Sequence, residues 1–391
     1  MNKRKQNPLL GAAFLMATSA IGPGFLTQTV VFTEQLAASF GFAILVSVVL
    51  DIAAQMNVWR VVAVAGKSAQ EIANMIFPGL GILLTVLIVF GGLAFNIGNI
   101  AGAGLGINVL FGIDTVYGAI ISCLLALGVF VVREAMIAMD NAARILGFLM
   151  IGLTVYVAIA SAPPLGLALK ESFAPTKIDL QSILTIVGGT VGGYITFAGA
   201  HRLLDAGVKG EGALKDVDRS AVTAIGLASL MRILLFLAAL GVVMTGAAIQ
   251  KANPAASMFQ IAAGDVGYKL FGIVLWSAAI TSVIGSAYTS VSFLRGLHSF
   301  FETNQRLVTI LFIITSTLIF IWKGQPVKVL LLAGALNGMI LPLALTLMLI
   351  AAHRKKIVGT YKHPMWMSVL AMVVIITMTY IGTNVIAASL K

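Results

Sequence analysis

Long apolar segments follow one another along almost the whole chain of 391 residues. A helix that crosses a membrane needs about 20 mostly apolar residues, and the chain holds about eleven segments of that kind. They cover residues 9–38, 41–64, 79–109, 115–133, 142–163, 181–204, 219–248, 266–294, 306–322, 327–351 and 365–389. The connections between them are too short for a separate folded domain. The pattern therefore predicts a single all-α integral membrane domain over residues 1–391.

Two of these segments are interrupted by glycine at corresponding places, around Gly22-Pro23-Gly24 and around Gly192-Gly193. A matched pair of broken helices, the first and the sixth, is typical of secondary transporters built from two repeats. Five helices is an odd number, so the second repeat enters the membrane from the opposite side. We therefore expect an inverted repeat of residues 9–163 and 181–351, with an extra helix at 365–389. The alternative interpretation is that glycine and proline serve only kinks and close helix packing.

Charge is scarce and unevenly placed. The chain is 59% hydrophobic and 10% charged, with a formal net charge of +11. Lysine and arginine gather in the connections that fall on one side of the membrane, as the positive-inside rule expects. The basicity is therefore explained by topology rather than by nucleic-acid binding. We expect a multi-pass protein of the plasma membrane with a cytoplasmic N-terminus, in which residues 9–38 are a retained first helix rather than a cleaved signal.

Motifs of enzymes and of ATP-driven pumps are missing from the sequence. There is no His-Glu-x-x-His zinc motif, and Gly66-Lys67-Ser68 lacks the earlier glycine of a phosphate-binding loop. Cys123 is the single cysteine, so no disulfide forms within the chain. We therefore expect no enzyme activity and no cofactor.

Three stretches resemble the natural resistance-associated macrophage protein (NRAMP) family of transporters. Val61 to Ala73 is similar to the exit of that family's second helix, and Asn108 to Ile113 to its turn between helices 3 and 4. Asn337 to Gly359 is similar to its tenth helix and exit. The matches follow the family's order through almost the whole chain. The resemblance implies a LeuT-like fold, with a 5+5 inverted repeat, an eleventh helix and broken helices 1 and 6.

The departures from this family concern its metal ligands. Typical members carry Asp-Pro-Gly-Asn in helix 1, where this chain has Gly22-Pro23-Gly24-Phe25. They carry Met-Pro-His in helix 6, where this chain has Gly192-Gly193-Tyr194, and two acids in helix 3, where it has Asn96 and Asn99. A divalent cation needs anionic or strongly dipolar oxygen ligands. The sequence therefore predicts no metal site of the usual kind.

The altered breaks instead favour an uncharged, amide- and hydroxyl-lined pocket. Free backbone N–H groups at helix ends attract an anionic group of a ligand. The residues predicted to bind substrate are Ser19, Gly22, Gly24, Thr27, Gln28, Asn96, Asn99, Gly192, Gly193, Tyr194, Thr196 and Phe197. Two alternatives stay open: Asn96 and Asn99 form hydrogen bonds between helices, and Tyr194 and Phe197 pack in the core.

Ionisable side chains inside membrane segments are candidates for ion coupling, because they are costly there. The candidates are Glu34, Asp51, Arg232 and His201, to which the resemblance to sodium symporters adds Ser282 and Ser286 of helix 8. Alternatively, Asp51 and Arg232 form a structural ion pair. Glu34 then reaches the outer interface, His201 anchors the inner one, and the serines only pack helices.

These features predict a proton- or sodium-coupled secondary transporter that works by alternating access in a lipid bilayer. Its expected substrate is a small organic solute such as an amino acid, an imino acid or a cyclic carboxylate. The alternative is an NRAMP-type transporter of divalent metal cations, such as hydrated magnesium, which needs few direct ligands.

Overall fold

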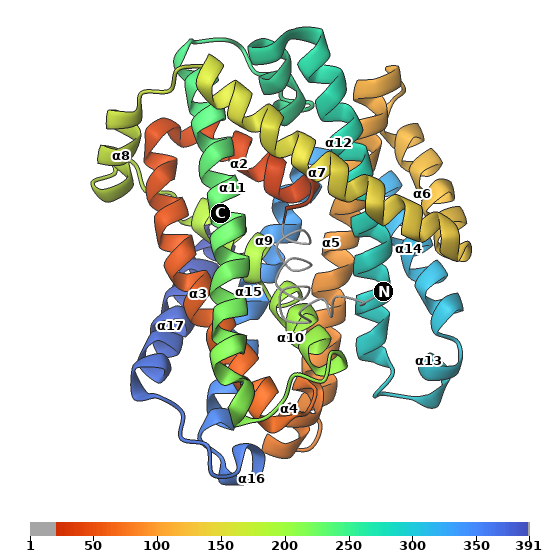
Figure 1. The fold of residues 1–391 in the computed structure, drawn as a ribbon, viewed down its shortest axis with the longest axis vertical. Helices are drawn as coiled ribbons and strands as arrows, with labels where there is room; N and C mark the ends of the chain where they lie inside the picture. The colour runs from red at the N-terminus through yellow and green to blue at the C-terminus, as the bar shows by residue number, and fades with distance from the viewer. Residues whose placement is uncertain (1–20, 390–391) are drawn as a thin grey trace, which may run out of the picture.

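The computed structural model describes residues 21–389, with side chains in that range except at 133–138, 140, 142–144 and 389. All of its regular elements there are helices (Figure 1). The helices are α2 (Pro23–Leu36), α3 (Phe40–Ala65), α4 (Ala69–Ile76), α5 (Leu80–Phe111), α6 (Thr115–Val131), α7 (Arg133–Ala160), α8 (Leu165–Phe173), α9 (Leu180–Val191), α10 (Ile195–Asp205), α11 (Leu214–Met244), α12 (Pro254–Leu294), α13 (Ser299–Thr303), α14 (Gln305–Lys323), α15 (Pro326–Ala352), α16 (Lys355–Val358) and α17 (Met365–Ser389). Short 3-10 turns lie at Ala37–Ser39 and Glu211–Ala213.

The helices account for the predicted membrane segments. By length and composition, eight segments of the described range can each cross a membrane. The first, Pro23–Ala65, has 43 residues and would measure about 65 Å as one helix, twice the apolar thickness of about 30 Å. It turns at Ala37–Ser39, where Ala37 has a φ of 49°, and so holds the second half of the predicted helix 9–38 and the predicted helix 41–64. The pair α7 and α8, bent by 104°, and the shorter α6 supply the rest.

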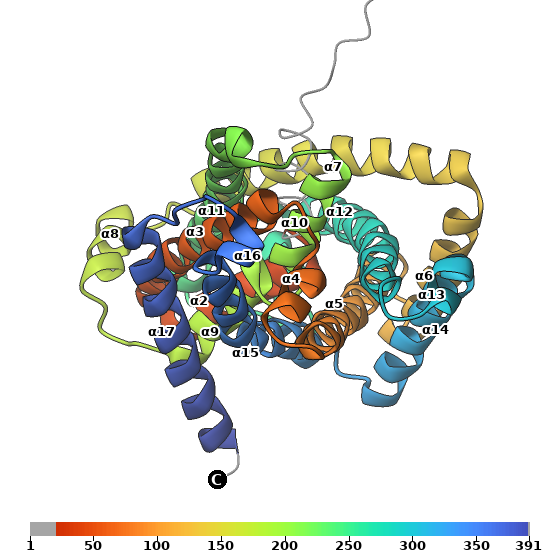
Figure 2. The same cartoon turned by 90° about the horizontal axis from the view of Figure 1, so that it is seen from below.

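The segments with breaks lie in the middle of the bundle. Helix α2 packs on α11, and α9 packs on α15 and α3. Figures 1 and 2 show α17 at one edge of the bundle and α6 and α14 at another. Helix α15 packs on α9 and α5, α12 packs on α5, and α11 packs on α3. The buried apolar side chains form one large cluster and two smaller ones between these helices. Residues of the two halves of the chain therefore meet at the centre.

Local sequence explains where several helices begin and end. Helix α3 stops at Gly66, which has the left-handed φ of 61° that glycine adopts without strain. Helix α4 begins with a capping box, in which Ser68 and Glu71 satisfy each other's backbone N–H groups. Hydrogen bonds from Ser68 also hold the pKa of Glu71 below its usual value. Helix α12 contains a break at Gly264 (φ 63°), close to residue 266, where the sequence predicts the start of this membrane segment.

Candidate functional site

The predicted break of the sixth helix is present between α9 and α10. Helix α9 ends at Val191, Gly192 is extended with a ψ of 179°, and α10 begins at Ile195. The backbone N–H of Gly193 donates to the carbonyl oxygen of Asn337 at 2.9 Å. The N–H of Tyr194 donates to the Asn337 side-chain oxygen at 3.1 Å. Asn337 of α15 therefore takes up the donors that the break releases.

Asn337 is not among the site residues that the sequence predicts. Its side chain is fully buried, and its amide nitrogen donates to the carbonyl oxygens of Gly91 in α5 and Ala333, both at 3.0 Å. One side chain thus connects α15, α5 and the break. The signal available in the sequence was a single amide within an otherwise apolar helix, which predicts a buried partner but does not say which one.

Glycines allow α9 to approach α15 at backbone distance. A Cβ atom at Gly188 would overlap the carbonyl oxygen of Gly334, and one at Gly193 would overlap the side chain of Ile340. A Cβ at Gly192 would lie 2.6 Å from the Cβ of Asn337. The glycines of this segment therefore serve close packing as well as the break.

Of the predicted break in the first helix, the structure describes only the residues from Ile21 onward. Helix α2 starts at Pro23 and is capped by the extended Gly22, while Ser19 lies outside the described residues. Gln28 is 1% exposed, and its side-chain nitrogen donates to the carbonyl oxygen of Leu330 in α15 at 3.0 Å. Its side-chain oxygen has no hydrogen-bond partner. Helix α15 therefore contacts both broken helices.

The remaining predicted residues on α2 lie close to this contact. A Cβ at Gly24 would meet the Gln28 side-chain nitrogen at 3.5 Å, which is ordinary contact, and Thr27 is buried.

Arg232 lies between the two breaks. Its Nη2 donates to the hydroxyl of Thr190 at 3.1 Å, just before the break in α9–α10, and its guanidinium carbon is 4.3 Å from the ring centre of Phe25 in α2. The residue is 2% exposed, and its Nη1 has no hydrogen-bond partner. A positive charge with a free donor therefore sits beside both broken helices.

Asp51 of α3 is 1% exposed and close enough for its charge to act on Arg232. The two do not make direct contact: within 4.0 Å, the described residues form ion pairs only between Arg60 and Asp218 and between His201 and Asp205. One carboxylate oxygen of Asp51 also has no hydrogen-bond partner. The two residues therefore leave one buried acceptor on α3 and one buried donor on α11 without a hydrogen-bond partner.

Asn96 and Asn99 of α5 face polar groups of neighbouring helices. Asn96 donates to Ser316 of α14 at 3.0 Å and accepts from the Ser286 hydroxyl of α12 at 2.9 Å, while Asn99 donates to Ser286 at 3.4 Å. The Tyr194 hydroxyl donates to the carbonyl oxygen of Ser286 at 3.3 Å. The arrangement matches the alternative of hydrogen bonds between helices, and it brings Tyr194 to the same place.

The other predicted residues are spread along the bundle. The Thr196 hydroxyl donates to the carbonyl oxygen of Val191 at 2.6 Å and closes the break on its far side. Phe197 is buried near His201, whose Nε2 is 3.9 Å from a carboxylate oxygen of Asp205. Glu34 is exposed at the end of α2, and Ser282 is half-buried. These positions are not gathered around Arg232.

Carboxylates and imidazoles are not clustered in the described chain. Within residues 21–389, no group of three or more His, Cys, Asp or Glu side chains is placed to hold a metal ion. The charged side chain that reaches the two breaks is a guanidinium, which repels a cation.

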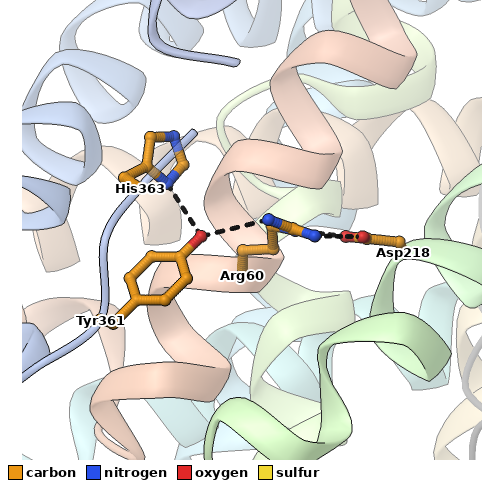
Figure 3. A network of polar contacts seen from close by, with 4 residues as sticks. All are labelled: Arg60, Asp218, Tyr361 and His363. Carbon is orange, nitrogen blue, oxygen red and sulfur yellow. Dashed lines mark hydrogen bonds and ion pairs between the residues drawn. The ribbon is translucent and has the colours of Figure 1, made fainter. Parts of the chain in front are cut away.

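A separate polar network ties the ends of α3 and α11 to the loop before α17 (Figure 3). Arg60 pairs with Asp218 through two hydrogen bonds and donates to the Tyr361 hydroxyl at 3.2 Å. Tyr361 is 3.1 Å from His363 Nδ1, and His363 Nε2 is 2.8 Å from the side-chain oxygen of Asn57. Since that oxygen only accepts, Nε2 carries the ring proton and Nδ1 accepts from Tyr361. Burial lowers the pKa of His363 to about 4.

The sequence matches a known family over nearly its whole length. A family model described as natural resistance-associated macrophage protein-like matches residues 13–388. An uncharacterized membrane protein of Bacillus subtilis, YcsG, is 59% identical over 98% of this chain and 95% of its own length. A membrane protein of Haemophilus influenzae is 54% identical over 98% and 96% of the two chains.

Solved structures of three transporters share the fold. The Eremococcus coleocola manganese transporter has a TM-score of 0.71 at 16% identity, over 99% of this chain and 88% of its own. MhsT in complex with L-phenylalanine has a TM-score of 0.65 at 15% identity, over 98% of both chains. Mhp1, a nucleobase-cation-symport-1 family transporter, has a TM-score of 0.58 at 15% identity, over 96% and 91%. The described chain thus has the LeuT-like fold.

Proposed function

Because the chain belongs to the natural resistance-associated macrophage protein family, a family of membrane transporters, we propose that it carries a small organic carboxylate. The class of substrate is an amino acid, an imino acid or a cyclic carboxylate. Transport is coupled to a proton or to sodium and proceeds by alternating access. The chain lies in the plasma membrane with its N-terminus on the cytoplasmic side, as the distribution of lysine and arginine favours.

The position of Arg232 is the observation that carries this proposal. Its guanidinium contacts residues next to both breaks, Phe25 and Thr190, and keeps one donor nitrogen without a partner. Asp51 lies nearby but makes no ion pair in direct contact with Arg232. A buried charge without a directly bound partner is expensive, and a carboxylate is the group that a guanidinium binds best. A substrate carboxylate beside Arg232 would supply that directly bound partner.

The other unpartnered groups suit the remaining part of such a substrate. The side-chain oxygen of Gln28 and one carboxylate oxygen of Asp51 are buried acceptors. A substrate N–H or ammonium group would donate to one of them. Asp51 is also the buried acid that we assign to a coupling proton, because its carboxylate is not neutralised by direct contact with Arg232.

The metal-transport alternative is favoured by the solved structure of a manganese transporter with the same fold. Against it stands the chemistry of the breaks, which have no carboxylate and lie beside a guanidinium. A hydrated cation would have to be held by carbonyl and amide oxygens close to a positive charge. We therefore place it second.

A thermal-unfolding screen of the detergent-purified protein tests the proposal. A ligand at about 100 times its dissociation constant stabilises the folded state by about 2.7 kcal/mol. We expect stabilisation by small carboxylates, lost in Arg232→Lys and retained in Arg219→Lys, which changes an exposed arginine of the same helix. Stabilisation by manganese or magnesium alone, undiminished in Arg232→Lys, would favour the metal alternative.

A further inference from the structure

A shallow apolar groove lies on the outside of the bundle, where α17 crosses α3. It has a volume of about 190 Å³ and is lined by Val49, Ile52 and Met56 of α3 and by Trp366, Met367 and Leu370 of α17. Figure 2 shows α17 at the edge of the molecule. Val49 is 56% exposed and Trp366 57% exposed. In a membrane protein, apolar side chains at such a place face lipid.

The polar residue at the bottom of the groove has its bonds satisfied. Asn57 is 2% exposed, its nitrogen donates to the carbonyl oxygens of Ala53 and Met367, and its oxygen accepts from His363. The groove therefore offers no free polar group, and its occupant must be apolar.

Three lysines lie in α16 and in the loop that connects it to α17. Lys355, Lys356 and Lys362 are exposed, and none forms an ion pair within 4.0 Å with an acid of the described residues. Lys362 directly precedes His363, which bonds to Asn57 in the groove. Lys355 and Lys356 belong to α16, which packs on α3, the helix that lines one side of the groove. The three lysines therefore gather on the segment that connects α15 and α17, beside the groove.

Neighbouring acids do not cancel this charge. Asp218 is held by Arg60 in the network of Figure 3. Glu211 accepts a long hydrogen bond of 3.4 Å from Thr360, and it is a single carboxylate near three lysines. The segment beside the groove thus keeps a net positive charge.

We propose that the groove and these lysines form a binding site for an anionic phospholipid. An acyl chain lies along the groove, and the phosphate headgroup contacts Lys362 together with Lys355 and Lys356. Clusters of basic residues directly beside a membrane helix attract anionic headgroups, and tryptophan favours the same interfacial depth. The groove is too small for another helix, which measures about 10 Å across. This site is independent of the substrate of transport.

Trp366 lines the groove, so its fluorescence reports on a lipid that binds there. Of the other tryptophans, Trp59 is fully buried, and Trp276 is half-buried and donates its indole N–H to Ser122. Quenching that is lost in Trp366→Phe is therefore the part that reports on the groove. Trp322 is 78% exposed, so the reporter protein carries Trp322→Phe. It is reconstituted in phosphatidylcholine vesicles in which either brominated phosphatidylglycerol or brominated phosphatidylcholine quenches fluorescence. We expect brominated phosphatidylglycerol to quench Trp366 fluorescence at least threefold more effectively than brominated phosphatidylcholine at the same mole fraction.

The lysines are tested by a charge-matched pair of triple variants. One triple variant combines Lys355→Gln, Lys356→Gln and Lys362→Gln. It should reduce the ratio of quenching by phosphatidylglycerol to quenching by phosphatidylcholine to about one. The control triple variant makes the same charge change at exposed positions elsewhere, with Lys170→Gln, Lys177→Gln and Lys251→Gln. It should leave this quenching ratio unchanged. Raising the ionic strength to about 1 M, where the Debye length is about 3 Å, should also weaken the preference.

Three results would overturn the proposal. One is equal quenching of Trp366 by both lipids in the reporter protein. Another is a preference that survives the first triple variant or is lost equally in the second. The last is selective quenching that remains after Trp366→Phe.

Discussion

Replacement of Asn337 by alanine removes the side chain that holds the break between α9 and α10. The backbone N–H of Tyr194 then loses its acceptor in a buried place, which costs about 1–3 kcal/mol. The hydrogen bond to the carbonyl oxygen of Gly91 is also lost, which costs about 0.5–1.5 kcal/mol. The bond from Gly193 to the backbone oxygen of residue 337 remains. We expect a total loss of about 2–4 kcal/mol of unfolding free energy.

The assay is thermal unfolding of the purified protein in detergent without ligand. An unfolding entropy of about 2.1 cal/mol/K per residue gives about 0.8 kcal/mol/K for this chain, so the midpoint should fall by about 2–5 °C. Asn384→Ala is the matched control, because the exposed Asn384 makes the same kind of bond within its helix, to the carbonyl oxygen of Tyr380 at 2.7 Å. It should shift the midpoint by less than about 1 °C.

Asn337→Asp separates the two functions of the side chain. The carboxylate can still accept from Tyr194, but it cannot donate to Gly91 and adds a charge in the core, so it should destabilise at least as much as alanine. Equal midpoints for Asn337→Ala and Asn384→Ala would refute the assignment of Asn337 as the residue that secures the break.

Two further predictions concern packing and pH. Gly193→Ala places a methyl group against Ile340 and should cost about 1–3 kcal/mol, while Gly285→Ala, with no atom within 4 Å of its Cβ, should not destabilise; their melting midpoints decide this. The pKa of His363 is lowered by burial to about 4, against about 6.5 in an unfolded chain, so the unfolded state binds the proton more readily. The stability that the neutral ring contributes is complete above about pH 6.5 and is lost as the pH falls towards 4, by about 1–2 kcal/mol after allowance for solvent screening. His363→Gln should flatten unfolding free energy against pH in this window, and an unchanged slope would contradict the assignment.

The helices and the break between α9 and α10 follow from local patterns, and so they could be predicted. Apolar runs of membrane length define the segments, and glycine marks the ends of α3 at Gly66 and of α9 at Gly192. The eventual partners of these residues depend on contacts between distant parts of the chain. Asn337 is 143 positions from Tyr194 in the sequence, and nothing local links the two.

Charged and polar residues illustrate the same limit. Arg232 is conspicuous within an apolar helix, and pairing with Asp51 is the simplest expectation. The fold instead directs its guanidinium to Thr190 and Phe25, because α11 passes close to both breaks. The sequence predicts Asn96 as a substrate ligand, with hydrogen bonds between helices as the alternative, and in the fold Ser286 and Ser316 satisfy its amide.

Solute flux into proteoliposomes tests the central claim, that Arg232 makes this carrier a carboxylate transporter, most directly. Protein is reconstituted, an imposed proton or sodium gradient is applied, and uptake of small carboxylates is compared with uptake of manganese. The account predicts gradient-driven uptake of a carboxylate that is lost in Arg232→Lys and retained in Arg219→Lys, with no manganese flux. Manganese uptake by the unaltered protein that is maintained or increased in Arg232→Lys, without carboxylate uptake, would contradict it.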